Sequence, residues 1–216
     1  MIELSDPERA LAVAYAPATV RPALTCLFAL DERLAGIVAA TTEPTIGLIR
    51  LAWWREALER LDREDPPAEP LLQALAELRP LGVSGQALSE IEDGWAALLE
   101  GDADDAAMAR HATARGATLF VLAGRLLQAD PDPRLAAAGQ GWALADLGHR
   151  HSSADVRERA RTKARATFPR TGWPKALRPL GMLATLARAD AGVSGTRRQG
   201  APGRLLRMLA LRLTGR

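Results

Sequence analysis

Thr42–Leu61, TEPTIGLIRLAWWREALERL, is the stretch that decides the fold class. Thr42 can cap a helix, and Pro44 suits the first turn, where its missing N–H is not needed. Apolar residues then recur at helical spacing and predict one long buried face: Ile46, Ile49, Trp53, Ala57 and Leu61. The stretch therefore predicts an amphipathic helix packed on other helices.

The tandem tryptophans make this helix unusual. Neighbouring residues on a helix diverge by about 100°, so Trp53 and Trp54 cannot face the same way. One of them is expected in the core and the other near a rim or cavity. An ordinary buried helix with no ligand role is the alternative, and it explains the apolar stripe by itself.

The same residues carry a family resemblance. EPTIGLIRLAWWREAL closely resembles the segment after the first aspartate-rich helix of the squalene/phytoene synthase family. It is nearest to a divergent branch that includes a mitochondrial complex I assembly factor. Ala23–Val38, Gly116–Gln128 and Ala138–Leu147 are similar to that family's first core, mid-chain and second motif helices. The resemblance covers roughly residues 8–190 and implies an all-α, class I isoprenoid-synthase-like helical bundle.

Helix signals recur along the whole chain, and no segment alternates apolar and polar residues as a strand would. Expected N-caps include Ser5 in a capping box with Glu8, and Ser84 further along. Either Asp102 or Asp104, and either Ser152 or Ser153, are further expected caps. Ten helices are expected, at about 8–16, 22–40, 43–62, 71–79, 84–101, 102–129, 134–150, 153–168, from 174 and from 202.

These signals predict a single domain over residues 1–216, with a Gly- and Arg-rich mobile loop at 191–203 and a basic helix at 203–216. The lone Cys26 is expected in the core. The first ten residues, MIELSDPERA, lack the pattern of a signal peptide. Uncharged stretches reach about 11 residues, whereas a spanning helix needs about 20. A cytoplasmic protein is expected, soluble or peripheral on the inner face of the membrane.

Acidic and basic residues are distributed unevenly along the chain. Residues 1–150 hold 13 Arg or Lys and 23 Asp or Glu, net −10, whereas residues 151–216 hold 15 and 3, net +12. This asymmetry favours an anionic partner for the basic part, such as a membrane surface or a diphosphate. The alternative is internal pairing with the acidic part. Nucleic acid is not expected as a partner, because the basic part has no recognisable module and only one aromatic pair, Phe168 and Trp173.

Most of the metal-binding aspartates that the resemblance implies are missing from this sequence. Enzymes of that family condense two prenyl diphosphates with Mg²⁺ held by two aspartate-rich motifs. Ala39 or Ala40 stands where the first motif should begin, and Asp146 is the only carboxylate of the second. We therefore expect a non-catalytic homologue with no cofactor and no metal site. The alternative is an active prenyl diphosphate transferase with altered metal ligands, which would need Mg²⁺.

The resemblance also implies candidate cavity or ligand-binding residues, namely Arg50, Trp53, Trp54, Gln140 and Asp146. An isoprenoid or other lipid is the implied ligand. A respiratory-complex subunit is the partner suggested by the assembly-factor branch. The resulting hypothesis is a role in assembly, or in isoprenoid or lipid handling, at the membrane surface.

The last helix offers a second candidate surface. Its leucines gather on one face and arginines flank them, as in helices that lie on anionic bilayers. The predicted membrane-binding residues are Arg204, Leu205, Arg207, Leu209 and Arg212. The alternative is a terminal helix docked on the bundle.

Overall fold

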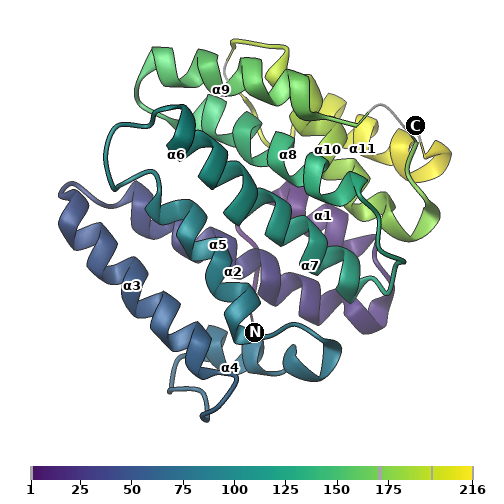
Figure 1. Cartoon of the computed structure of the whole chain (residues 1–216). Helices are drawn as coiled ribbons and strands as arrows, with labels where there is room; N and C mark the ends of the chain where they lie inside the picture. The colour runs from purple at the N-terminus through teal and green to yellow at the C-terminus, as the bar shows by residue number, and fades with distance from the viewer. Residues whose placement is uncertain (1, 170–171, 196, 216) are drawn as a thin grey trace.

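The computed structural model describes residues 2–169, 172–195 and 197–215, and within these ranges the regular structure is helical throughout. The all-α prediction is confirmed, and each expected helix has a counterpart (Figure 1). The α-helices are α1 (Pro7–Ala14), α2 (Arg21–Ala39), α3 (Pro44–Arg60), α4 (Pro70–Ala76), α5 (Gly85–Ala96), α6 (Asp105–Arg110), α7 (Thr118–Leu126), α8 (Arg134–Arg150), α9 (Ala154–Thr167), α10 (Arg178–Ala191) and α11 (Pro202–Thr214).

The sixth expected helix is continuous but not uniform. A π-helical segment, η3 (His111–Ala117), joins α6 to α7 without a break. Short 3₁₀ turns lie at η1 (Ala18–Val20), η2 (Arg79–Leu81) and η4 (Lys175–Leu177). Because π-helical turns are rare and cluster at functional sites, η3 marks the part of the bundle to examine for a site.

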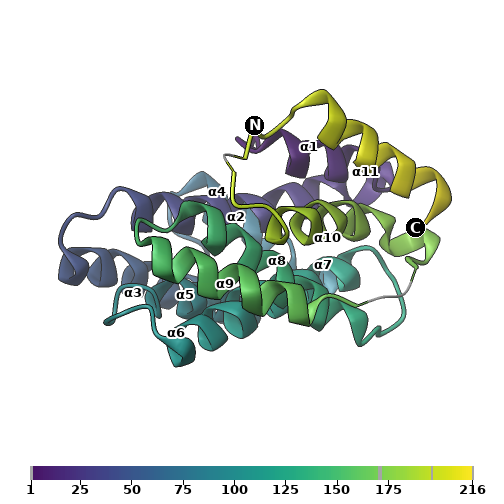
Figure 2. The ribbon, with the colours of Figure 1, turned by 90° about the horizontal axis from the view of Figure 1, so that it is seen from above.

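Two helices organise the bundle. The helix α8 packs on α9, η3, α10 and α7, while α5 packs on α3 and η3. The helix α10 in turn contacts α1 and α11, so the first and last helices lie at the same end of the molecule (Figure 2). The segment η3 thus lies between α5 and α8, with His111 and Arg115 buried and Thr113 exposed.

The helix α3 turns a different face to the core than the sequence predicts. Leu51, Trp54 and Leu58 are buried, and α5 is the helix that packs most closely on α3. By contrast, Ile46, Ile49 and Trp53 are 45%, 65% and 49% exposed, so the predicted buried stripe is wrong for these three residues. Only its last members, Ala57 and Leu61, are buried. The divergence of the tandem tryptophans is confirmed, with Trp54 in the core.

The reason lies in a close crossing of α3 with α5. A side chain added at Gly85 would place its Cβ 2.0 Å from the carbonyl oxygen of Leu58. At Gly47, the Cβ would lie 2.6 Å from Leu99. Glycines allow two backbones to approach in this way, and they turn the face that contains Gly47 and Leu58 inward.

Most expected caps are present. Ser84, Asp104 and Ser153 each accept a hydrogen bond from a first-turn backbone N–H, as predicted. The capping box at Ser5 is wrong, because Asp6 caps α1 and the Ser5 hydroxyl donates to Glu32 instead. Glu43 rather than Thr42 precedes α3.

The C-terminal helix is docked on the bundle. Met208 and Leu211 are buried, whereas Leu206 and Leu213 are exposed. Cys26 is in the core, as predicted. Within the described residues, no helix combines the length and the apolar character needed to cross a membrane.

Candidate functional site

A buried arginine occupies the middle of the bundle. Arg115 projects from η3 and donates hydrogen bonds to Asp31 of α2, 2.7 Å from Nε and 3.0 Å from Nη2. Its Nη2 also lies 3.0 Å from a carboxylate oxygen of Asp146 on α8. The guanidinium carbon lies 4.0 Å from the ring centre of Trp95 and 4.6 Å from that of Trp142. We call these five side chains the Arg115 centre.

Glycines make room for this centre. A Cβ at Gly94 of α5 would lie 2.5 Å from the backbone nitrogen of Arg115. Gly116 and Gly139 face each other, and a Cβ at Gly139 would lie 2.0 Å from the Gly116 carbonyl oxygen. The segment η3 is therefore held tightly between α5 and α8, which aims the side chain of Arg115 inward.

His111 supports Arg115 from the preceding turn. Its Nδ1 lies 2.6 Å from the carbonyl oxygen of Gly94, and its Nε2 lies 3.1 Å from Nη1 of Arg115. Burial, together with the neighbouring guanidinium of Arg115, lowers the pKa of His111 to about 3. The ring is therefore neutral, with Nδ1–H donating to Gly94 and Nε2 accepting from Arg115.

Asp31 is fully buried and fully paired. It accepts hydrogen bonds from Arg115 and from the indole of Trp95, and Arg9 of α1 lies 2.8 Å away. Burial alone would raise the pKa of Asp31, but the charges of Arg115 and Arg9 outweigh it and hold that pKa at about 2. The carboxylate is therefore ionised, and its charge is balanced by arginines.

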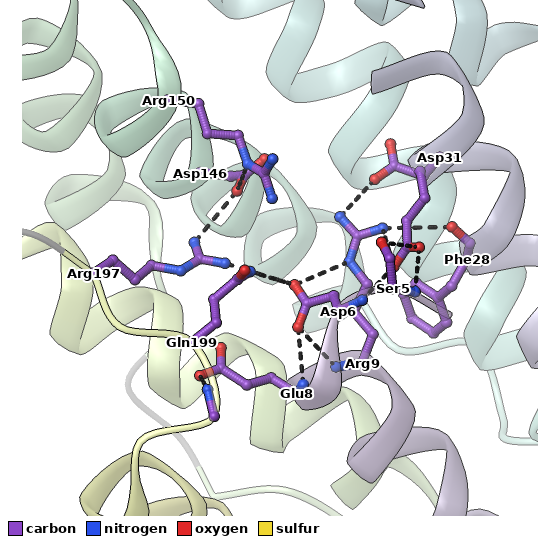
Figure 3. Close-up of polar contacts among 12 residues, drawn as sticks. Ser5, Asp6, Glu8, Arg9, Phe28, Asp31, Asp146, Arg150, Arg197 and Gln199 are labelled. Carbon is purple, nitrogen blue, oxygen red and sulfur yellow. Dashed lines mark hydrogen bonds and ion pairs between the residues drawn. The ribbon is translucent and has the colours of Figure 1, made fainter. Parts of the chain in front are cut away.

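Asp146 links the centre to the protein surface. Arg150, one turn later on α8, donates to it over 2.8 Å, and Arg197 donates over 3.3 Å (Figure 3). Burial would raise the pKa of Asp146, but Arg115, Arg150 and Arg197 together hold it well below its usual range. One buried carboxylate is thus shared by three guanidinium groups.

The segment between α10 and α11 contacts the start of α1. Gln199 donates to Asp6 over 2.6 Å, and Arg197 lies 3.7 Å from the same carboxylate (Figure 3). Arg204 on α11 forms ion pairs with both Glu8 of α1 and Asp190 of α10. This segment is the predicted mobile loop, of which residue 196 lies outside the described residues. Its mobility remains a prediction.

These contacts favour internal pairing for part of the basic C-terminal charge. Arg204, a predicted membrane-binding residue, donates hydrogen bonds to the carboxylates of Glu8 and Asp190 in the bundle. Arg212 lies over the Tyr15 ring, and Leu205 and Leu209 are partly buried. Of the predicted membrane-binding residues, Arg207 alone is exposed.

Little space remains on the side of the Arg115 centre that faces Arg9. The cavity between Arg9, Trp142 and Arg197 has a volume of about 10 Å³, enough for one water molecule at most. Each carboxylate oxygen of Asp31 and Asp146 accepts from at least one guanidinium. Mg²⁺ needs several oxygen ligands in near-octahedral geometry. The Arg115 centre therefore does not fit the metal cluster of a diphosphate-cleaving enzyme.

No other group of donors in the described part of the chain offers a metal site. Residues 2–169, 172–195 and 197–215 contain no cluster of three or more His, Cys, Asp or Glu side chains able to hold a metal ion.

Only one of the candidate cavity residues predicted from sequence lies in the Arg115 centre, namely Asp146. Arg50 and Trp53 are exposed on α3, and their place near a cavity or its rim stays a prediction. Trp54 is a core residue with Arg33 over its ring. Gln140 donates to Thr113 between α8 and η3. Binding of a ligand by these residues remains a prediction.

Sequence reasoning missed Asp31, Arg115, Arg9 and the role of His111. A signal was available for the first, because Asp31 directly follows the mostly apolar run Leu24–Leu30. The spacing of His111 and Arg115, four residues apart, would place both on one helix face.

Similarity to known proteins shows which family this chain belongs to. The family model of squalene/phytoene synthase matches residues 2–175, which is well over half of the chain. The chain belongs to the squalene/phytoene synthase family. Its helical bundle is accordingly the all-α isoprenoid synthase fold of that family.

One relative gives a more distant similarity. The rat (Rattus norvegicus) protein named NADH dehydrogenase (ubiquinone) complex I, assembly factor 6, is 31% identical over 75 residues. The matched part is 35% of this chain and only 22% of the length of the rat protein. No solved structure matches the chain.

Proposed function

We propose that this chain is a non-catalytic member of the squalene/phytoene synthase family that acts in the assembly of a respiratory NADH dehydrogenase. The observation that carries the first half of this proposal is the Arg115 centre. Arginines neutralise the buried carboxylates there, and the cavity beside Arg9 and Trp142 is too small for a prenyl chain.

The name of the rat relative supports the second half. It is an assembly factor of complex I, although the similarity covers only a small part of that protein. The exposed apolar residues of α3 are suited to a binding role, because Ile46, Ile49 and Trp53 lie one or two turns apart on one helix. The partner contacted there would be a subunit of the respiratory complex.

A turnover assay tests the loss of catalysis. The purified protein is incubated with farnesyl or geranylgeranyl diphosphate, with and without Mg²⁺, and diphosphate release is measured. We expect no release above the rate without protein. Release that requires Mg²⁺ and is lost in Asp146→Ala would establish the alternative, an active prenyl diphosphate transferase.

Affinity capture from membranes of the source organism tests the partner. We expect the intact chain to capture NADH dehydrogenase subunits, and the variant Ile49→Ser/Trp53→Ser to lose them. Val121→Ser is the matched control, because Val121 is also an exposed apolar residue but lies on α7. Equal capture by all three proteins would contradict a contact through α3.

Handling of an isoprenoid or other lipid at the membrane surface is the second candidate. Leu206, Arg207 and Leu213 are exposed on α11 and favour a peripheral contact with an anionic bilayer. Localisation on the inner face of the membrane belongs to this proposal. Captured lipid in extracts of the purified protein would support lipid handling over a purely structural role.

A further inference from the structure

A groove lined by basic residues lies at the end of the molecule where α1 and α11 meet (Figure 2). It has a volume of about 690 Å³ and opens between the end of α1, the start of α2, the turn η4 and α11. It shares no lining residue with the Arg115 centre. We call it the α1–α11 groove.

Three basic side chains line this groove, and none of its lining residues is acidic. The three are Arg21 on α2, Lys175 on η4 and Arg212 on α11. Arg197 and Arg204 form ion pairs with carboxylates of the bundle, whereas in the described ranges no ion pair reaches the three cations of the groove.

The carbonyl ends of two helices do not cancel this charge. The helices α1 and α11 both end beside the groove, and each C-terminus contributes about half a negative charge. Arg178 already donates to the carbonyl oxygens of Arg212 and Leu213 at the end of α11. The α1–α11 groove therefore carries a surplus of positive charge.

Arg212 has a donor that lacks an acceptor. Its guanidinium carbon lies 5.7 Å from the centre of the Tyr15 ring, so the ring covers one side of the cation. Its Nε is buried and has no hydrogen-bond partner within the described residues. A buried donor without an acceptor costs free energy, which an acceptor from another molecule would recover.

The rest of the lining is apolar and stiff. It includes Tyr15, which is 37% exposed, and the rings of Pro17 and Pro179. Proline fixes its own backbone torsion, and Arg21 is held by a hydrogen bond of 2.9 Å from its Nε to the carbonyl oxygen of Ala16. Little ordering is therefore needed when a ligand enters.

The shape of the groove favours a protein segment over a small molecule. Six of its nine lining residues are exposed, so it cannot enclose most of a ligand's surface, as small-molecule sites do. Its cations also come from three different elements. Several carboxylates spaced along a peptide would reach all of them, and an aromatic or apolar side chain between the carboxylates would pack on Tyr15 and the prolines.

We propose that the α1–α11 groove is a docking site for an acidic segment of a partner protein. Carboxylates of that segment pair with Arg21, Lys175 and Arg212, and an aromatic or apolar side chain lies against Tyr15. This site is separate from the contact proposed through α3, and it holds whether or not the assembly role is correct.

Tyr15 offers a local probe, because it is the only tyrosine in the chain. Incorporated fluorotyrosine gives a single fluorine NMR signal from the groove of the full chain. The probe ligand is the peptide acetyl-Glu-Glu-Trp-Glu-Glu-amide, and the matched peptide has glutamine in place of each glutamate. We expect a saturable shift of the Tyr15 signal with the acidic peptide and an affinity about tenfold or more lower for the glutamine peptide.

Substitutions in the groove should weaken binding of the acidic peptide. Arg212→Gln should do so about tenfold, because a partly buried, charge-assisted contact is lost, and Lys175→Gln about twofold to fivefold, because Lys175 is exposed. Ala176→Glu places a carboxylate at the groove and should abolish the shift by repulsion. Ala176 is exposed, so this variant keeps the fold.

The matched control is Arg188→Gln. Arg188 is exposed on α10, the helix that contributes Pro179, but it does not line the groove. This variant changes the net charge by the same amount as Arg212→Gln and should alter the affinity less than about twofold.

Three outcomes would overturn the proposal. The first is the absence of a saturable shift with the acidic peptide, and the second is an equal affinity for the acidic and glutamine peptides. The third is a shift of the Tyr15 signal with phosphatidylglycerol vesicles but not with the acidic peptide, which would make the groove a membrane contact instead.

Discussion

Arg115 and Asp31 form a bidentate ion pair in which neither side chain is more than 1% exposed. The same guanidinium contacts Asp146, so a single cation connects α2, η3 and α8. A pair this deeply buried gains little net stability over well-packed apolar residues, but removal of one partner leaves an uncompensated charge. The centre therefore makes the fold of this chain dependent on Arg115.

Arg115→Met should destabilise the protein strongly. The thioether fills part of the space, but Asp31 and Asp146 lose their shared cation, and we expect the free energy of unfolding to fall by about 3–5 kcal/mol. Urea denaturation measures this loss. Arg50→Met is the control, because Arg50 is exposed on α3 and should cost less than about 0.5 kcal/mol. Similar losses for both variants would refute a structural role for the Arg115 centre.

His111 should give the protein a measurable pH dependence. Its pKa is about 3 in the folded state and near 6.5 when unfolded, so the unfolded state binds the proton more readily between these values. The free energy of unfolding should therefore decrease as the pH falls below about 6.5, by up to about 1.4 kcal/mol per pH unit. Asp31 adds to this decrease only below about pH 4, since its pKa is lowered to about 2.

Comparison with His111→Gln isolates this contribution. The amide keeps a donor and an acceptor for Gly94 and Arg115 but cannot titrate. Urea denaturation at several pH values between about 5 and 6.5 should give a steeper slope for the intact protein than for the variant. The other histidines are common to both proteins, so their contributions cancel. Equal slopes would contradict the assignment of His111 as a buried, neutral ring.

Glycine substitutions should act in opposite directions at two helical positions. Gly139→Ala places a Cβ 2.0 Å from the Gly116 carbonyl oxygen, so α8 and η3 must separate, at a cost of about 1–3 kcal/mol. Gly36→Ala on α2 meets nothing within 4 Å and should stabilise the helix by about 0.5–1 kcal/mol. Thermal unfolding of both variants measures the difference. A neutral Gly139→Ala would show that the crossing is looser than described.

The sequence allowed the helices to be predicted but not the faces that they bury. The caps at Ser84 and Asp104 follow from local hydrogen bonding, and local rules suffice for them. In α3, apolar residues lie on more than one side, and periodicity selected the stripe that contains Trp53, whereas Trp54 is the buried one. The contact of Gly85 on α5 with Leu58, which is remote in sequence, determines which face of α3 is buried. Arg115 escaped detection for the same reason, because its partners Asp31 and Asp146 come from distant helices.

The pairing of Arg204 with Glu8 and Asp190 should hold α11 on the bundle. Burial raises the pKa of Glu8, but Arg204 lowers it on balance, which indicates a net attraction. Arg204→Gln should increase amide hydrogen exchange across residues 202–214 by about tenfold or more. Arg207→Gln is the matched control, since Arg207 lies on the same helix and is exposed. Equal exchange in both variants would show that contacts other than the ion pairs of Arg204 hold α11 on the bundle.

Peripheral binding to anionic membranes is the last prediction, and the structure changes which residues test it. Leu206 and Leu213 are 66% and 78% exposed, so they replace Leu205 and Leu209 as the residues expected to enter a bilayer. Charge attraction is screened within about 8 Å at physiological salt, whereas the leucines add an apolar contribution that salt does not remove. In flotation with anionic vesicles, raised salt should release most of the protein, and Leu206→Asp/Leu213→Asp should release the remainder.

Leu81→Asp is the control for this experiment, because Leu81 is an exposed leucine on the 3₁₀ turn η2 rather than on α11. It should float like the intact protein. If the intact protein ignores anionic vesicles at low salt, the membrane hypothesis fails. The net charge of +12 in residues 151–216 would then be explained by pairs such as Arg204 with Glu8 and Arg197 with Asp146, which join the basic part of the chain to its acidic part.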